Sequence, residues 1–136
     1  MGSGNRARCS AAICSMVFQP RRTMGRPRAS RPTTVPAPVL AGIAHGELLA
    51  LSAFGSADGV VARGVSRLVT IASGLDPHGL GVPEVYWLRR ADEYRSAVAG
   101  FASGHPEAVG VWLTMCCRAL EDGAREALSI AEAAAQ

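Results

Sequence analysis

The sequence lacks the features that define several protein classes. It contains no lysine, and only seven of its 136 residues are aromatic. So few aromatic residues, together with abundant alanine, glycine and valine, disfavour a β-sandwich and favour helices that pack closely through small side chains. No apolar run approaches the roughly eighteen residues that a membrane-spanning helix needs, so we expect no association with a membrane.

Metal and disulfide patterns are also missing. The four cysteines form no C-x-x-C spacing. Cys116 and Cys117 are adjacent, and neighbouring residues on a helix point about 100° apart, which suits neither a shared zinc ion nor a disulfide. We therefore expect reduced thiols, no metal site and a cytoplasmic protein.

Charge divides the chain into two parts. Residues 1–40 contain seven arginines and no carboxylate, whereas the remainder has seven arginines and eleven acidic residues. The segment Gln19–Pro38 holds five of the eight prolines and has no apolar periodicity, so it cannot bury enough surface to offset its ordering entropy. We predict a disordered, arginine- and proline-rich tail over residues 1–36 and a helical domain over residues 37–136.

The basic tail raises nucleic-acid binding as one alternative function. Its arginines could contact phosphates, with a strong dependence on salt concentration. However, the tail carries one aromatic residue, Phe18, and no recognisable DNA- or RNA-binding module. Nucleic acid is therefore the disfavoured partner.

Apolar spacing predicts a mostly α-helical domain with about four helices. The first begins near Ala37, and the second follows the capping sequence Ser56–Asp58. Glycines and prolines interrupt Ser73–Val85, which we predict to be a loop. A short helix is expected over Ala91–Ala102, and a long amphipathic helix begins at Pro106, a residue that suits a first helical turn.

The second predicted helix has two different faces. One carries Arg63 and Arg67, four residues apart, which we expect to face solvent. The other is an apolar stripe, which we expect to face the core. Its members are Val61, Val65, Leu68, Val69 and Ala72.

The stretch LSAFGSADGVVAR, residues 51–63, is a glycine-containing turn that opens this helix. Backbone N–H groups at such a helix start lack intrahelical partners and can bind a phosphate. Asp58 stands inside the turn, where its negative charge opposes that role. A second interpretation therefore treats Asp58 as a helix N-cap, worth about 1 kcal/mol, and the turn as structural.

The segment His45–Val69, HGELLALSAFGSADGVVARGVSRLV, resembles the active-site region of the Fic (Fido) family. In that family a helix leads into a loop with the pattern H-P-F-x-[D/E]-G-N-G-R-x-x-R, which opens the next helix. The resemblance implies a mostly helical fold. It also implies transfer of AMP from ATP, with magnesium, to a protein hydroxyl.

Several family positions are altered in this chain. Ser52 stands where the family has its catalytic histidine, and a serine of ordinary pKa cannot accept a proton near neutral pH. Ser56 replaces the acid that holds magnesium, and Val60 replaces the first arginine. The remaining candidates are Phe54 as a loop anchor in the core, and Asp58, Gly59 and Arg63 as a nucleotide- or phosphate-binding set.

These losses predict a degenerate Fic-like domain that is deficient in AMP transfer. We expect it to act as a binding or regulatory module with an unknown protein partner and weak nucleotide binding. The alternative enzyme is a nonstandard protein adenylyltransferase that uses ATP and magnesium through Asp58, Gly59 and Arg63. His45 lies two helical turns before Ser52, and a lone helical histidine is more often structural than catalytic.

Overall fold

The computed structural model of this chain describes residues 35–135. Contacts divide the chain into Met1–Pro36 and Ala37–Gln136, so the predicted tail lies almost wholly outside the described residues. The second unit is mostly α-helical, as the sequence predicts, and its described residues contain no strand. Its elements are α2 (Ala37–Leu51), the 3₁₀ helix η1 (Gly55–Ala57), α3 (Asp58–Ala72), α4 (Glu84–Arg89), α5 (Ala91–Ser103) and α6 (Pro106–Ala134).

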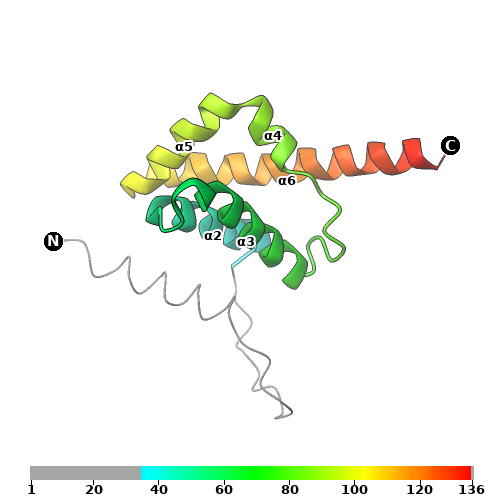
Figure 1. Cartoon of the computed structure of the whole chain (residues 1–136), viewed down its shortest axis with the longest axis horizontal. Helices are drawn as coiled ribbons and strands as arrows, with labels where there is room; N and C mark the ends of the chain where they lie inside the picture. The colour runs from blue at the N-terminus through cyan, green and yellow to red at the C-terminus, as the bar shows by residue number, and fades with distance from the viewer. Residues whose placement is uncertain (1–34, 136) are drawn as a thin grey trace, which may run out of the picture. The chain divides into compact units, whose positions relative to one another are not determined.

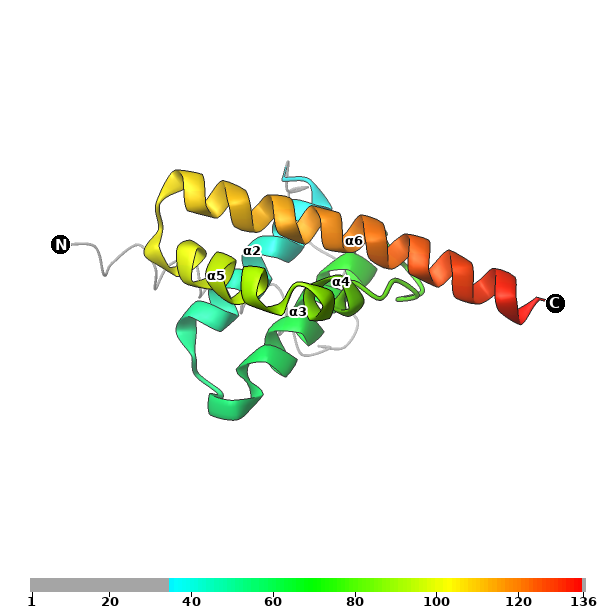
Figure 2. The same ribbon diagram turned by 90° about the horizontal axis from the view of Figure 1, so that it is seen from above.

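Helix α2 lies at the centre of this arrangement and contacts α3, α5 and α6. Helix α5 packs against α6, and the short α4 also lies on α6 (Figure 1). The last turns of α6 extend past the other helices in both views (Figure 2). No helix among the described residues is long and apolar enough to cross a membrane.

Helix boundaries follow local sequence signals. Pro106 opens α6, where its missing N–H costs nothing, and Glu107 complements the positive end of the helix dipole. Gly104 ends α5 with a φ of 74°, a left-handed conformation that glycine adopts without steric penalty. These two predicted boundaries, around the α5–α6 turn, agree with the structure.

Aromatic side chains from α4, α5 and α6 form the core around one histidine of α2. Trp112 is fully buried, and its indole N–H donates to the Gly42 carbonyl of α2 (2.8 Å). A Cβ at Gly46 would lie 2.7 Å from the Phe101 ring. The glycines of α2 therefore let the central helix approach the aromatic core closely.

Helix α3 is rotated relative to the sequence-based prediction. Its buried residues are Ala62, Ser66 and Thr70, whereas Leu68 of the predicted core stripe is 54% exposed. Small side chains at four-residue intervals let α3 lie close to α2, which buries alanine and glycine on its own side. Close backbone contact therefore determines which face is buried, and the larger valines and leucine lie at the edge or outside.

One helix was not predicted. Residues Glu84–Arg89 form α4, directly after Pro83, where the sequence indicated the end of a loop and no further helix. A six-residue helix contains fewer than two turns, so apolar periodicity cannot reveal it. Its Tyr86 and Trp87 are both buried in the core. The described residues therefore contain α4 in addition to the four helices that apolar spacing indicated.

Candidate ligand-binding site

Ser52 lies directly after α2, with a positive φ of 47°. Its side chain is exposed, and its hydroxyl donates a hydrogen bond to the Leu49 carbonyl (3.1 Å). A general base must accept a proton from the reacting hydroxyl. The Ser52 hydroxyl instead donates its hydrogen bond to the backbone of α2, which gives Ser52 a local structural role.

Two predictions about the α2–α3 loop are wrong. Phe54 is 49% exposed, so it does not anchor the loop in the core. Asp58 is the first residue of α3, but its Oδ1 accepts a hydrogen bond from the Phe54 N–H (2.6 Å) and from no N–H of its own helix. The turn η1 brings these two residues together. The Asp58 carboxylate therefore closes the loop upstream of α3, while its charge still complements the helix dipole.

This loop does not fit magnesium and ATP. Ser56, at the position of the family's metal acid, offers a neutral exposed hydroxyl, and the Asp58 carboxylate is engaged with the backbone. No group of three or more histidine, cysteine or acidic side chains in residues 35–135 could hold a metal ion. Magnesium prefers several oxygen ligands including carboxylates, so no step of AMP transfer follows from these residues.

Arg63 of α3 differs from the other motif residues in its surroundings. It is half-buried. Its side chain folds back along the helix toward Gly59, since a Cβ added at Gly59 would lie 3.0 Å from Arg63 Nη1, which shows how close the two residues are. The ion pairs among the described residues all involve other arginines. The Arg63 guanidinium lies near the Tyr94 hydroxyl and has no carboxylate partner among the described residues, which leaves it able to pair with an anion.

His45 is fully buried near this arginine. Its ring lies edge-on to Trp87 and Trp112, with centroid distances of 4.8 and 5.1 Å. A hydrogen bond joins its Nε2 to the Tyr94 hydroxyl (2.9 Å), and its Nδ1 has no partner among the described residues. Burial, aided by the positive charge of Arg63, lowers the pKa of His45 from 6.5 to about 3. His45 is therefore neutral at physiological pH.

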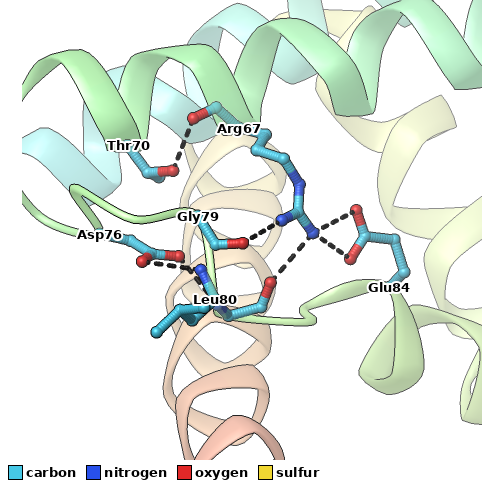
Figure 3. A network of polar contacts seen from close by, with 7 residues as sticks. Arg67, Thr70, Asp76, Gly79, Leu80 and Glu84 are labelled. Carbon is cyan, nitrogen blue, oxygen red and sulfur yellow. Dashed lines mark hydrogen bonds and ion pairs between the residues drawn. The ribbon is translucent and has the colours of Figure 1, made fainter.

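Arg67 braces the loop that connects α3 to α4. Its guanidinium donates to the carbonyls of Gly79 (2.7 Å) and Gly81 (2.9 Å) and forms an ion pair with Glu84 (3.2 Å), as Figure 3 shows. The prediction that Arg67 faces solvent is therefore wrong. Three acceptors on one guanidinium hold this glycine- and proline-rich loop in a defined position.

Asp76 strengthens the same loop from within. Its carboxylate accepts hydrogen bonds from the N–H groups of Leu80 (3.0 Å) and Gly81 (2.9 Å) (Figure 3). Burial alone would raise the pKa of Asp76, but these backbone hydrogen bonds and the charge of Arg67 hold it below its ordinary value. The carboxylate therefore stays charged and keeps the loop folded.

A groove with a volume of about 690 Å³ lies between α3, this braced loop, α4 and the C-terminal half of α6. Arg63 and Trp87 are among the residues that line it. Much of the remaining wall is apolar and includes Leu80, Leu120 and Leu128. The groove is large enough for a small ligand. Its charged lining residues are Arg63, Arg67, Asp76, Glu84 and Glu121, and Arg63 forms no ion pair among the described residues.

The sequence indicated Arg63 as a site residue but not the other residues that build this groove. A loop rich in glycine and proline leaves many backbone groups without partners, so a charged side chain nearby is expected to satisfy them. That signal could have indicated Arg67 and Asp76 as braces. Trp87 carried no comparable signal, because its burial depends on the unpredicted helix α4.

Comparisons with protein-family models, curated proteins and solved structures find no match to this chain. Function therefore has to be argued from the geometry and chemistry of the site.

Proposed function

We propose that this chain is a helical binding module, similar to Fic domains in its motif, that binds an anionic group at Arg63 and does not transfer AMP. The observation that carries the proposal is the half-buried guanidinium of Arg63, which lines a groove and has no carboxylate partner among residues 35–135. An anion that enters the groove can form a charge-assisted hydrogen bond with this guanidinium.

The surroundings of Arg63 support binding without transfer chemistry. Ser52 and Asp58 are both hydrogen-bonded to the backbone. His45 is buried and neutral, and its Nε2 is engaged with Tyr94. These contacts favour the binding module over the alternative adenylyltransferase, because neither Ser52, at the family's histidine position, nor the buried His45 is placed to accept a proton from an incoming hydroxyl.

Calorimetry with inorganic phosphate and with ATP, each with and without magnesium, tests the proposal. We expect weak, salt-sensitive binding that magnesium does not strengthen. Arg63→Gln should abolish it. Arg118→Gln is the matched control, since Arg118 is exposed, forms no ion pair among the described residues and does not line the groove.

Two results would overturn the proposal in different ways. No binding of either probe by the wild-type chain, in a folded sample, removes the anion site. Transfer of label from [α-³²P]ATP to any protein, lost in Arg63→Gln, establishes the enzyme in place of the binding module.

A further inference from the structure

Two buried polar atoms of the core have no hydrogen-bond partner among residues 35–135. They are Nδ1 of His45 and Nε1 of Trp87. His45 is fully buried and Trp87 is 6% exposed, and the two rings meet edge to face with their centroids 4.8 Å apart. An unpaired polar atom in a core costs free energy, and an unpaired N–H group is especially rare. This cost constrains where the hydrogen atoms of the cluster lie.

The constraint determines which nitrogen of His45 carries a hydrogen. The side chain is neutral, with a pKa of about 3, so only one ring nitrogen is protonated. The indole Nε1 of Trp87 always carries a hydrogen. A hydrogen on Nδ1 would leave two unpaired donors on two touching rings, whereas a bare Nδ1 leaves an acceptor on the ring that touches the unpaired donor. The second arrangement costs less, so the hydrogen of His45 lies on Nε2.

This tautomer sets the direction of the hydrogen bond between His45 and Tyr94. Nε2 of His45 lies 2.9 Å from the Tyr94 hydroxyl, so the N–H donates and the hydroxyl oxygen accepts. The Tyr94 O–H is then left to donate to another acceptor. Burial raises the pKa of Tyr94, although the charge of Arg63 acts in the opposite direction, so the hydroxyl keeps its hydrogen near neutral pH.

The charged group beside this hydroxyl cannot accept that hydrogen. The guanidinium of Arg63 lies near the Tyr94 hydroxyl, and a guanidinium only donates. Arg63 has no carboxylate partner among the described residues. Two donors, one of them charged, therefore lie close together at the arginine that lines the groove.

We infer that Tyr94 is the second donor of the anion site, so that one oxyanion accepts hydrogen bonds from both the Arg63 guanidinium and the Tyr94 O–H. This inference rests on the proposed function, since it names a further contact of the same bound anion. The ligand class is an oxyanion with at least two acceptor oxygens, such as a phosphate or carboxylate group. His45 is a positioning residue, because its Nε2–H occupies the Tyr94 oxygen and leaves the hydroxyl hydrogen for the ligand.

Nuclear magnetic resonance of the full wild-type chain at pH 7.5 tests both steps. Long-range ¹H–¹⁵N correlation reads the tautomer of His45, and we expect the hydrogen on Nε2. Inorganic phosphate should shift the ¹³Cζ resonance of Tyr94 and leave that of Tyr86 unchanged. Tyr86 is the matched reporter, since it is the other tyrosine of the chain and its ring lies against Arg90, 4.1 Å from the guanidinium carbon to the ring centroid.

Calorimetry with inorganic phosphate measures the contribution of the hydroxyl. Tyr94→Phe should weaken binding by at least about tenfold, the loss expected for one hydrogen bond to a charged group. Tyr86→Phe is the control and should bind as the wild type does. Tyr94→Phe also removes the partner of a buried histidine, so circular dichroism and a thermal melt must show that the variant is folded at the temperature of the titration.

Two results overturn the inference and leave the proposed function standing. A hydrogen on Nδ1 of His45 would mean that Tyr94 donates to His45 and has no hydrogen for a ligand. Phosphate binding by folded Tyr94→Phe at the wild-type affinity would show that Arg63 binds the anion without the hydroxyl. Failure of the folded wild type to bind phosphate is a different outcome, because it removes the anion site itself and the inference with it.

Discussion

Acid should destabilise this domain mainly through His45. The side chain is fully buried against Trp87 and Trp112, and burial together with the charge of Arg63 lowers its pKa from 6.5 to about 3. In the unfolded chain the same side chain titrates at its ordinary pKa. Between these two pKa values the unfolded state binds a proton that the folded state does not, so the free energy of unfolding falls as the pH falls.

The two pKa values set the size of the effect. Above about pH 7.5 neither state is protonated at His45, and its contribution is constant. At pH 5, which is about 1.5 units below the ordinary pKa of 6.5, His45 is protonated in the unfolded chain and still neutral in the folded domain. This difference corresponds to a loss of about 2 kcal/mol in the free energy of unfolding. The loss continues to grow toward pH 3, where the folded state also begins to bind the proton.

Urea unfolding, followed by tryptophan fluorescence at pH 7.5, 6 and 5, measures this loss. The comparison variant is His45→Gln, whose side chain can still hydrogen-bond the Tyr94 hydroxyl but carries no charge in either state. We expect the variant to be less stable than the wild type at pH 7.5, with a flatter dependence on pH. His105→Gln serves as the control, since His105 is exposed at the start of α6.

The difference between the two pH profiles isolates His45, because every other titratable group is shared. If the wild type and His45→Gln lose the same free energy between pH 7.5 and pH 5, the reasoning fails. That result would mean that His45 accepts a proton in the folded domain near its ordinary pKa.

Three further predictions concern the backbone and the loop. Gly123→Ala should destabilise the domain by about 2 kcal/mol or more, because the new Cβ would lie 2.6 Å from the Pro83 nitrogen. Gly110→Ala on the same helix meets open space and should stabilise the domain by about 0.5–1 kcal/mol. Equal effects of the two substitutions in thermal melts would contradict the close contact at Gly123. Arg67→Met should cost about 1–2 kcal/mol and expose residues 73–83 to limited proteolysis, since it removes the bonds that brace the loop; a loop as resistant as in the wild type would refute the bracing role. Ser52→Gly should stabilise by about 0.5–1 kcal/mol, because the φ of 47° suits glycine, and a loss of stability in urea titration would show that the bond to Leu49 matters more.

The candidate site was predicted only in part. The sequence indicated Arg63 as the retained motif arginine, and the structure places it in the wall of a groove. It also predicted core burial for Phe54 and an N-cap for Asp58, and both predictions are wrong, because η1 turns the two residues toward each other at the surface. A loop of irregular backbone has no periodicity, so residue spacing cannot reveal which of its groups meet.

The sequence by itself determined the helical class and the α5–α6 turn, because proline, glycine and apolar spacing act within a few residues of each other. Only the tertiary structure decided which side of α3 is buried, that Arg67 holds a loop twelve and fourteen residues away, and that His45 is enclosed by tryptophans from α4 and α6. These outcomes depend on how closely two helices can approach and on which backbone groups remain without partners. Both are properties of residues distant in sequence, so no local pattern encodes them.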